Sequence, residues 1–428
     1  MMIPGMVTFE EGEAFARRMD AEDSLRHFRN EFLFPRHKDG EPVIYLVGNS
    51  LGLQPRKAKQ YVMEELEDWE RLGVEGHFHA RHPWLPYHET LTAQTARLVG
   101  ALPFEVVVMN TLSVNLHLMM VSFYRPTRER FRILVEAGAF PSDMYAVASQ
   151  ARFHGFDPQE AILRLEPRPG EDTLREEDIL DTIDRHGPEI ALVLMGNVNY
   201  LTGQAFNMKA ITRAAHERGC RVGFDLAHGA GNLRLSLHDD GPDFAVWCSY
   251  KYLNGGPGTL GGVFIHERHA HMPGIPRFEG WWGHDKTTRF QMGPQFVPLP
   301  GAEGWQLSNP PILQMAVLRA SMELFDQATM TALRLKGDLL TSYLEFLLDR
   351  LPPGIVQIIT PRELNARGSQ LSLRFRKEPK QLLAKLGEAG AFCDFREPDV
   401  IRAAPAPLYC SFLDVYRFVR ILENHARD

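Results

Sequence analysis

A lysine and an aspartate lie at the ends of two expected strands, and together they could hold an aldehyde cofactor. Residues 244–248 form an apolar run, and Lys251 follows in a turn that leads into glycines. Desolvation there lowers the pKa of a lysine, and a neutral amine can form a Schiff base. Asp225 ends the apolar run 220–224, where a carboxylate could keep a pyridine nitrogen protonated. Lys251 alone would be an ordinary surface lysine, but the pair favours a pyridoxal phosphate (PLP) site.

The elements that must position this pair have the pattern of an α/β sheet, because strand-like apolar runs alternate with helical periodicity from about residue 88. Ligands in such sheets bind at the carboxyl ends of the strands, where Asp225 and Lys251 both fall. The expected strands number seven and cover residues 105–109, 131–135, 161–165, 190–195, 220–224, 244–248 and 262–265.

The flanking regions suggest a division into domains. We predict an N-terminal segment at 1–50 that packs with the small domain, a large PLP-binding domain at 51–311, and a smaller α/β domain at 312–428. A helix is expected over 55–72, with Pro55 suited to its start. Residues 270–309 are irregular and rich in aromatic side chains, which is typical of functional or interface segments.

Composition excludes several classes of protein. The chain has 428 residues, 44% of them hydrophobic and 24% charged, and a net charge of −7 without a basic run, so neither nucleic acid nor a membrane is an expected partner. The first ten residues lack a signal-peptide pattern. The four cysteines show no paired spacing, which fits a reducing, cytoplasmic location. Histidine-rich stretches at 77–82 and 266–271 lack matching ligands, so no metal is expected.

Other residues could anchor a cofactor and an amino acid, although each has an ordinary alternative. Ser113 falls at an expected helix start, where free N–H groups favour a phosphate, but it could simply be an N-cap. Phe140 could lie flat on a pyridine ring with Asp143 nearby, or belong to the core. Arg402 could bind a carboxylate in a bidentate manner, and periodicity alone does not single it out.

Long motifs spread over nearly the whole chain resemble those of the kynureninase family. They are residues 49–53, 109–117, 140–143, 223–228, 247–254, 280–284, 308–311 and 401–409. The resemblance implies a fold-type-I PLP-dependent transferase fold, with a mostly parallel seven-stranded sheet in the large domain and a smaller α/β domain. It also implies a homodimer with shared active sites that acts on a small amino-acid substrate.

The resemblance assigns a role to each matching residue. Lys251 would bond to the cofactor, Asp225 would face the pyridine nitrogen, and Tyr250 would transfer protons. The other cofactor-binding residues would be Leu112, Ser113, Phe140, Pro141, Ser142, Asp143 and His228, with Trp281 and Asn309 reaching in from the partner subunit. The substrate would meet Asn49, Ser50, His77, Ser308, Asn309 and Arg402.

The implied reaction is hydrolysis of the Cβ–Cγ bond of L-kynurenine or 3-hydroxy-L-kynurenine in tryptophan catabolism or NAD biosynthesis, giving L-alanine and an anthranilate. The polar set His77, Ser308 and Asn309 favours the 3-hydroxy substrate, unless His77 is a surface histidine. A class-V aminotransferase, a cysteine desulfurase and a non-catalytic PLP-binding protein are the alternatives. Two positions depart from the family: Ser113 replaces a frequent Thr, and Gly196 replaces a hydroxyl residue, whose hydrogen bond a neighbour such as Asn197 could supply.

Overall fold

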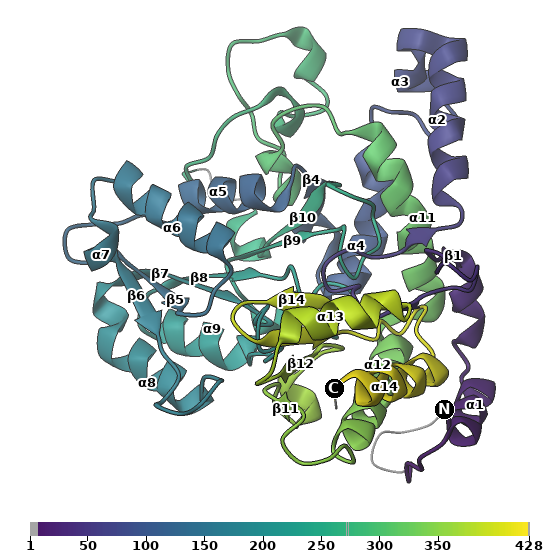
Figure 1. Cartoon of the computed structure of the whole chain (residues 1–428). Helices are drawn as coiled ribbons and strands as arrows, with labels where there is room; N and C mark the ends of the chain where they lie inside the picture. Colours follow the sequence, from purple (N-terminus) through teal and green to yellow (C-terminus); the bar gives the residue numbers. More distant parts are fainter. Residues whose placement is uncertain (1–6, 271, 273, 427–428) are drawn as a thin grey trace.

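A seven-stranded sheet forms the centre of the computed structural model, which describes residues 7–270, 272 and 274–426 (Figure 1). β10 runs antiparallel to both of its neighbours, and the other neighbouring strands are parallel. This confirms the predicted, mostly parallel sheet. In spatial order the strands are β4 (Val106–Met109), β10 (Gly261–Ile265), β9 (Phe244–Cys248), β8 (Arg221–Asp225), β7 (Ile190–Gly196), β5 (Arg132–Glu136) and β6 (Ile162–Leu165).

Helices cover both faces of this sheet, which explains why its central strands are continuous apolar runs. Every residue of β9 is buried, as expected for a strand without a solvent-facing side. Figure 1 shows α5 and α6 on one side of the sheet and α8 and α9 on the other. The helices of this region are α4 (Thr92–Val99), α5 (Leu112–Phe123), α6 (Pro141–Phe153), α7 (Pro158–Ala161), α8 (Glu176–His186), α9 (Met208–Glu217) and α10 (Leu237–Asp240).

A second, antiparallel sheet lies in the C-terminal part of the chain. Its strands, in spatial order, are β11 (Gln357–Ile358), β12 (Leu371–Arg374), β15 (Val400–Ala403) and β14 (Asp394–Arg396). The accompanying helices are α11 (Ile312–Ala328), α12 (Met330–Leu348), α13 (Pro379–Glu388) and α14 (Phe412–Ala426). No helix among the described residues is long and apolar enough to cross a membrane.

The N-terminal segment contacts these C-terminal elements. β2 (Ile44–Tyr45) pairs in parallel with β13 (Ala391–Phe392). Asp20, on α1 (Glu13–Glu22), accepts hydrogen bonds from the first two backbone N–H groups of α14. The predicted domain limits at residues 50 and 311 remain predictions, and residues 1–6 and 427–428 lie outside the described part.

One local expectation was wrong, and two short strands were missed. Pro55 does not start a helix: it lies in β3 (Gln54–Pro55), which pairs with β1 (Phe32–Leu33), and α2 (Ala58–Leu72) begins later. Proline lacks an N–H, which suits an edge strand as well as a first helical turn. β13 and β14 were not expected, because runs of two or three residues are too short to show alternation. A short helix, α3 (Gly76–His79), follows α2. The segment 274–309 contains only short 3₁₀ turns, as expected from its irregular sequence.

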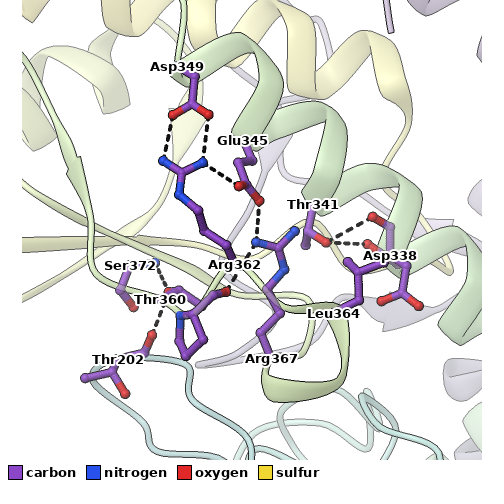
Figure 2. A network of polar contacts seen from close by, with 12 residues as sticks. Thr202, Asp338, Thr341, Glu345, Asp349, Thr360, Arg362, Leu364, Arg367 and Ser372 are labelled. Atoms are coloured by element: carbon purple, nitrogen blue, oxygen red, sulfur yellow. Dashed lines mark hydrogen bonds and ion pairs between the residues drawn. The ribbon is translucent and has the colours of Figure 1, made fainter. Parts of the chain in front are cut away.

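A polar network joins the C-terminal part of the chain to the loop 199–205 that follows β7. Figure 2 shows Arg362 bound to Asp349 and Glu345 of α12, and Arg367 sharing Glu345. The same view shows the Thr360 hydroxyl donating to the Thr202 carbonyl, at 2.6 Å. The ion pairs fix the loop 360–368 against α12, and Arg367 is almost fully buried there. The hydrogen bond of Thr360 then ties the loop 199–205 to this part of the chain.

Asp243 fixes the start of β9 beside β8, and so the register of the strands that carry the predicted lysine and aspartate. Its carboxylate, fully buried, accepts from the Val222 backbone N–H at 2.8 Å and contacts His216 and His269 at 2.9 and 2.7 Å. Burial alone would raise the pKa of Asp243, but the hydrogen bonds from these two histidines outweigh it and hold the pKa well below its usual range.

We predict that Asp243→Asn lowers the free energy of unfolding by about 3 kcal/mol, because it removes the charge that its buried partners require. Urea-induced unfolding followed by circular dichroism measures this change. Asp239→Asn is the matched control, since Asp239 is exposed and its loss should cost less than about 0.5 kcal/mol. Equal unfolding midpoints for the two variants would contradict a structural role for Asp243.

Candidate active site

One cavity lies at the carboxyl ends of β5, β7, β8 and β9, where the sequence placed the cofactor. Its volume is about 160 Å³, roughly ten times what a single water needs. Nine of the predicted residues line it. They are Leu112, Ser113, Phe140, Ser142, Asp143, Asp225, His228, Tyr250 and Lys251.

Lys251 points at a histidine. Its Nζ lies 3.0 Å from His228 Nε2 and 5.9 Å from the centre of the Phe140 ring. Burial, and then the charge of Lys251, lower the pKa of His228 well below its usual value, so the imidazole is neutral and its Nε2 can accept from the lysine. The backbone at Gly52 packs closely against the Lys251 carbonyl. Only glycine fits there, because a Cβ at residue 52 would lie 2.4 Å from that oxygen.

Three carboxyl groups, Glu136, Asp143 and Asp225, line the same cavity. Burial away from water is the largest cause of the raised pKa in each of these three groups. The pKa of Glu136 rises to about 7. Asp143 is hydrogen-bonded to Asp225, and repulsion from Asp225 raises the Asp143 pKa further. Lys251 and the Ala227 N–H, which Asp225 accepts at 2.7 Å, favour the ionised form of Asp225. Asp143 is therefore the protonated member of this pair.

Two helix N-termini meet at the wall of the same cavity. Ser113, in the first turn of α5, lies with its Oγ 3.0 Å from the Oγ of Ser142, in the first turn of α6. Neither N-cap residue, Thr111 or Phe140, caps its helix with a side chain. Free backbone N–H groups and two positive dipole ends therefore converge on this point, which favours an anion.

These features fit PLP. The ionised Asp225 at the cavity wall would pair with a protonated pyridine nitrogen. The paired helix ends with their two hydroxyls suit the phosphate, and Lys251 would supply the amine. The residues that would hold the cofactor are therefore present and oriented toward one cavity.

The remaining predicted residues do not line this cavity. Pro141 begins α6 and is exposed. Asn49 is buried and donates to Gln370 at 2.8 Å, and Ser50 follows it in a turn whose Gly52 N–H donates to the Tyr250 carbonyl. His77 is half-buried against Trp84. Trp281, Ser308 and Asn309 are exposed.

Arg402 is almost fully buried and already bound. Its Nε donates to Asp394 Oδ1 at 2.7 Å, its Nη2 donates to the other oxygen of that carboxylate, and its Nη1 donates to the Tyr200 carbonyl at 2.7 Å. Tyr200 in turn lines the cavity and packs edge-on against Phe140, with 5.1 Å between ring centres. Arg402 is thus separated from the cavity by one residue.

Comparison with known proteins settles the family. A family model described as the kynureninase C-terminal domain matches residues 333–422. A kynureninase from Myxococcus xanthus is 74% identical over 420 residues, which cover 98% of this chain and 99% of that protein. The chain belongs to the kynureninase family. A kynureninase from Koribacter versatilis is 61% identical and covers 96% of this chain and 97% of its own.

Solved structures of lower identity share the fold. A cysteine desulfurase from Thermococcus onnurineus NA1 superposes with a TM-score of 0.75 at 17% identity, covering 99% of this chain and all of its own. A C-DES mutant with glycine covalently linked to its PLP cofactor gives a TM-score of 0.72 at 18% identity, covering 89% of this chain and 96% of that one. The predicted fold class is thereby confirmed. Membership of the kynureninase family confirms the predicted cofactor, PLP.

Glu136 and Tyr200 are cavity residues that the sequence reasoning missed, together with Val198 and Ala227. Glu136 carried a usable signal, because it ends an apolar strand just as Asp225 does. Tyr200 carried none, since it lies in a loop whose position depends on the polar contacts to the C-terminal sheet.

The structure also accounts for Gly196. A Cβ at this position would lie 3.1 Å from Glu136 Oε1, so the carboxyl group of Glu136 occupies the space beside residue 196. The Gly196 backbone N–H is hydrogen-bonded to this carboxyl. Asn197, the neighbour expected to compensate, is buried with both side-chain polar atoms unpartnered within the described chain. The carboxyl group of Glu136, and not Asn197, therefore occupies the space that a side chain at residue 196 would fill.

Histidines outside the cavity cluster with carboxylates. His266 and His238 lie near the buried Glu105, with His238 Nδ1 at 3.1 Å from it, and the three ligand atoms could surround an ion. However, Glu105 also accepts the Leu102 and Glu267 N–H groups, and His266 Nδ1 accepts that of Arg268. These contacts already satisfy the ligand atoms. His271 of the predicted histidine-rich stretch lies outside the described residues.

We predict that Ser113→Ala weakens PLP binding about tenfold, because it removes a hydrogen bond to a charged group, worth about 1.5 kcal/mol. Titration of the apo-protein with PLP, followed by its absorbance, gives the dissociation constant. Ser113→Thr keeps the hydroxyl that other family members have and should bind as the wild type does. Equal weakening in both variants would mean that packing, and not the hydroxyl, matters here.

Proposed function

We propose that this chain is a kynureninase, which hydrolyses the Cβ–Cγ bond of L-kynurenine or 3-hydroxy-L-kynurenine and releases L-alanine and the corresponding anthranilate. The observation that carries the proposal is the 74% identity to a kynureninase over nearly the whole chain. The cavity that gathers Lys251, Asp225, His228 and Tyr250 supports it. A reaction of this kind belongs to tryptophan catabolism.

The residues around Lys251 suit proton transfer at the α-carbon of the substrate. PLP, when bound, supplies an aldehyde carbon that bonds to an amine and a ring that withdraws electrons from the substrate. Lys251 Nζ, as a free amine, would be the base that takes the Cα proton. The neutral His228 orients this amine through its Nε2. Asp225, in its ionised form, keeps the ring nitrogen protonated.

The hydrolytic step needs water and an acid. The oxygen of water bonds to Cγ, the electrons of the Cγ–Cβ bond move to Cβ, and Cβ then takes a proton. Burial, followed by the neighbouring Cys248, raises the pKa of Tyr250, so this phenol keeps its proton until one is required. Tyr250 therefore suits the role of general acid in this step.

Arg402 is the proposed partner of the substrate carboxylate. Because Asp394 occupies two of its nitrogen atoms, a substrate carboxylate would have to share or replace that contact. Arg396, whose Nη2 lies 3.1 Å from Asp394 Oδ2, could compensate the released aspartate. Such an exchange would make binding at Arg402 selective for a carboxylate.

The cavity lacks the reactive group that the alternative function of a cysteine desulfurase needs. A cysteine desulfurase requires a reactive thiol, but none of the four cysteines lines the cavity, and burial raises the pKa of each, to about 11 for Cys248. An aminotransferase would consume a keto acid, and a PLP-binding protein would convert nothing. The four free thiols favour a reducing compartment, and we propose the cytoplasm.

We predict that Lys251→Ala abolishes both turnover and the absorbance of the lysine-bound cofactor. Release of fluorescent anthranilate from L-kynurenine measures turnover and also excludes a binding protein, while a test for keto-acid dependence excludes an aminotransferase. The exposed Lys59→Ala is the control and should leave the rate unchanged. Wild-type rates in the Lys251 variant would refute the proposed function.

A homodimer is proposed because exposed apolar side chains gather on two protruding elements. α2, α3 and the segment 274–309 project from the same side of the molecule in Figure 1. Val74 and Phe78 are 74% and 54% exposed, and Phe290 and Met292 are 53% and 70% exposed. An isolated subunit would leave this apolar surface in water. Trp281 and Asn309 lie on the same segment, so the dimer would carry them toward the partner's cavity.

We predict sedimentation as a dimer at micromolar concentration, with Met292→Asp weakening the association because it places a charge in an apolar contact. Phe153→Asp is the matched control: Phe153 is 77% exposed on α6, away from the protruding elements, and its replacement should leave the dimer intact. A fully active monomer would contradict the shared active site.

The ring preference depends on His77, Ser308 and Asn309. His77 Nδ1 is buried without a partner within the described chain, and the other two side chains are exposed. All three lie on or beside the protruding elements, so they could meet a substrate ring across the dimer. A 3-hydroxyl group would satisfy polar atoms that plain kynurenine leaves unpaired.

We predict a kcat/KM for 3-hydroxykynurenine about tenfold above that for kynurenine, since an unpaired buried polar group costs about 1–3 kcal/mol. His77→Trp combined with Asn309→Thr should reverse the preference. The measurement is kcat/KM for both substrates on both proteins. A tenfold wild-type preference for plain kynurenine would exclude the polar ring pocket.

A further inference from the structure

Glu136 is a buried, titratable side chain of the cavity wall that the proposed reaction does not use. It ends β5 and is only 4% exposed. Between β5 and β8 lies β7, whose last residue is Gly196. Because residue 196 has no side chain, the Glu136 carboxyl group reaches across the end of β7 toward Asp225.

The hydrogen bonds of this carboxyl group are incomplete. It accepts from the Gly196 backbone N–H and from the Asn199 side chain. Oε2 is buried and has no partner within the described chain. A buried carboxylate oxygen without a donor is costly, whereas a protonated carboxyl group at this place is tolerable. The geometry therefore favours the neutral form of Glu136 before a pyridinium ring is bound.

The charged groups facing Glu136 come from the neighbouring elements. Asp225 ends β8 and Asp143 lies in the first turn of α6, and both carboxyl groups interact electrostatically with Glu136. Lys251 acts on Asp225 and Asp143 but is not among the groups that influence Glu136. Burial and the charge of Asp225 raise the pKa of Glu136 to about 7, so its proton can leave near neutral pH.

We infer that Glu136 is a positioning residue of the cofactor site: it gives up its proton to the solvent when the pyridinium ring of PLP settles against Asp225, and its new negative charge then stabilises the bound ring. Asp225 carries the direct interaction with the ring nitrogen, and Glu136 acts through Asp225 from across β7. This inference depends on the confirmed cofactor and not on the proposed reaction.

Proton linkage gives the sign and size of the effect. Below about pH 7 the cavity binds PLP only by expelling the Glu136 proton, so affinity rises with pH. For one group that titrates near pH 7 and loses its proton on binding, the dissociation constant falls about tenfold between pH 6 and pH 8. Other groups also titrate on binding, so the relevant quantity is the difference between the wild type and a variant without this carboxyl.

The test is calorimetric titration of the apo-protein with PLP at pH 6.5, in buffers of different ionisation enthalpy, which counts the protons released. We expect the wild type to release about 0.8 proton more than Glu136→Gln, because that is the fraction of Glu136 that is protonated at pH 6.5 when its pKa is about 7. The ratio of their dissociation constants should also change about tenfold between pH 6 and pH 8. Glu166→Gln is the matched control, because Glu166 directly follows β6 at the same edge of the sheet but is exposed and outside the cavity.

Equal proton release by the wild type and the Gln variant would overturn the inference. If that variant does not fold, infrared difference spectra of the wild type decide instead: the absorbance of buried, protonated carboxyl groups should fall by the share of Glu136 when PLP is added, while the share of Asp143 stays. An unchanged absorbance would overturn the inference. A wild-type protein that binds no PLP would contradict the cofactor itself, an outcome distinct from failure of the Glu136 inference.

Discussion

Three carboxyl groups share one cavity with a single lysine, and much of the site follows from the need to balance that charge. Asp225 and Glu136 are placed by strand ends and Asp143 by the first turn of a helix, so all three positions are set by the backbone. Water is excluded from them, and their proximity makes full ionisation unfavourable. The protein responds with a shared proton between Asp143 and Asp225 and with a neutral His228 beside Lys251.

The cavity also depends on parts of the chain that do not line it. Tyr200 is held by Arg402 and Gln370, and the loop around it by Thr360 and Ala366, all from the C-terminal part of the chain. The ion pairs of Figure 2 fix that part against α12. A change in the position of the C-terminal sheet would therefore reach the Phe140 ring through Tyr200.

The sequence predicted the seven strands and the Lys251–Asp225 pair because buried parallel strands are long apolar runs and ligands meet their carboxyl ends. It did not reveal Tyr200, because a loop held by distant side chains carries no local pattern. Glu136 could have been found by the rule that found Asp225. Nothing in the sequence showed that Gly196 makes room for Glu136, because that depends on the spacing of three neighbouring strands. The roles of His77, Ser308 and Asn309 depend on a second subunit and stay predictions.

The capping of α14 by Asp20 has a consequence for synthesis on the ribosome. α1 is synthesised before the strands of the central sheet, whereas α14, whose first N–H groups Asp20 of α1 caps, is synthesised after them. The buried residues of α1, Phe15, Ala16 and Met19, therefore lack their C-terminal neighbours until α14 has been synthesised. The strands of the central sheet lie between these two helices in the sequence, so the sheet can form before α1 and α14 pack together. A nascent chain stalled before residue 412 would expose this apolar helix face to chaperones, so this part of the fold can close only after α14 has been synthesised.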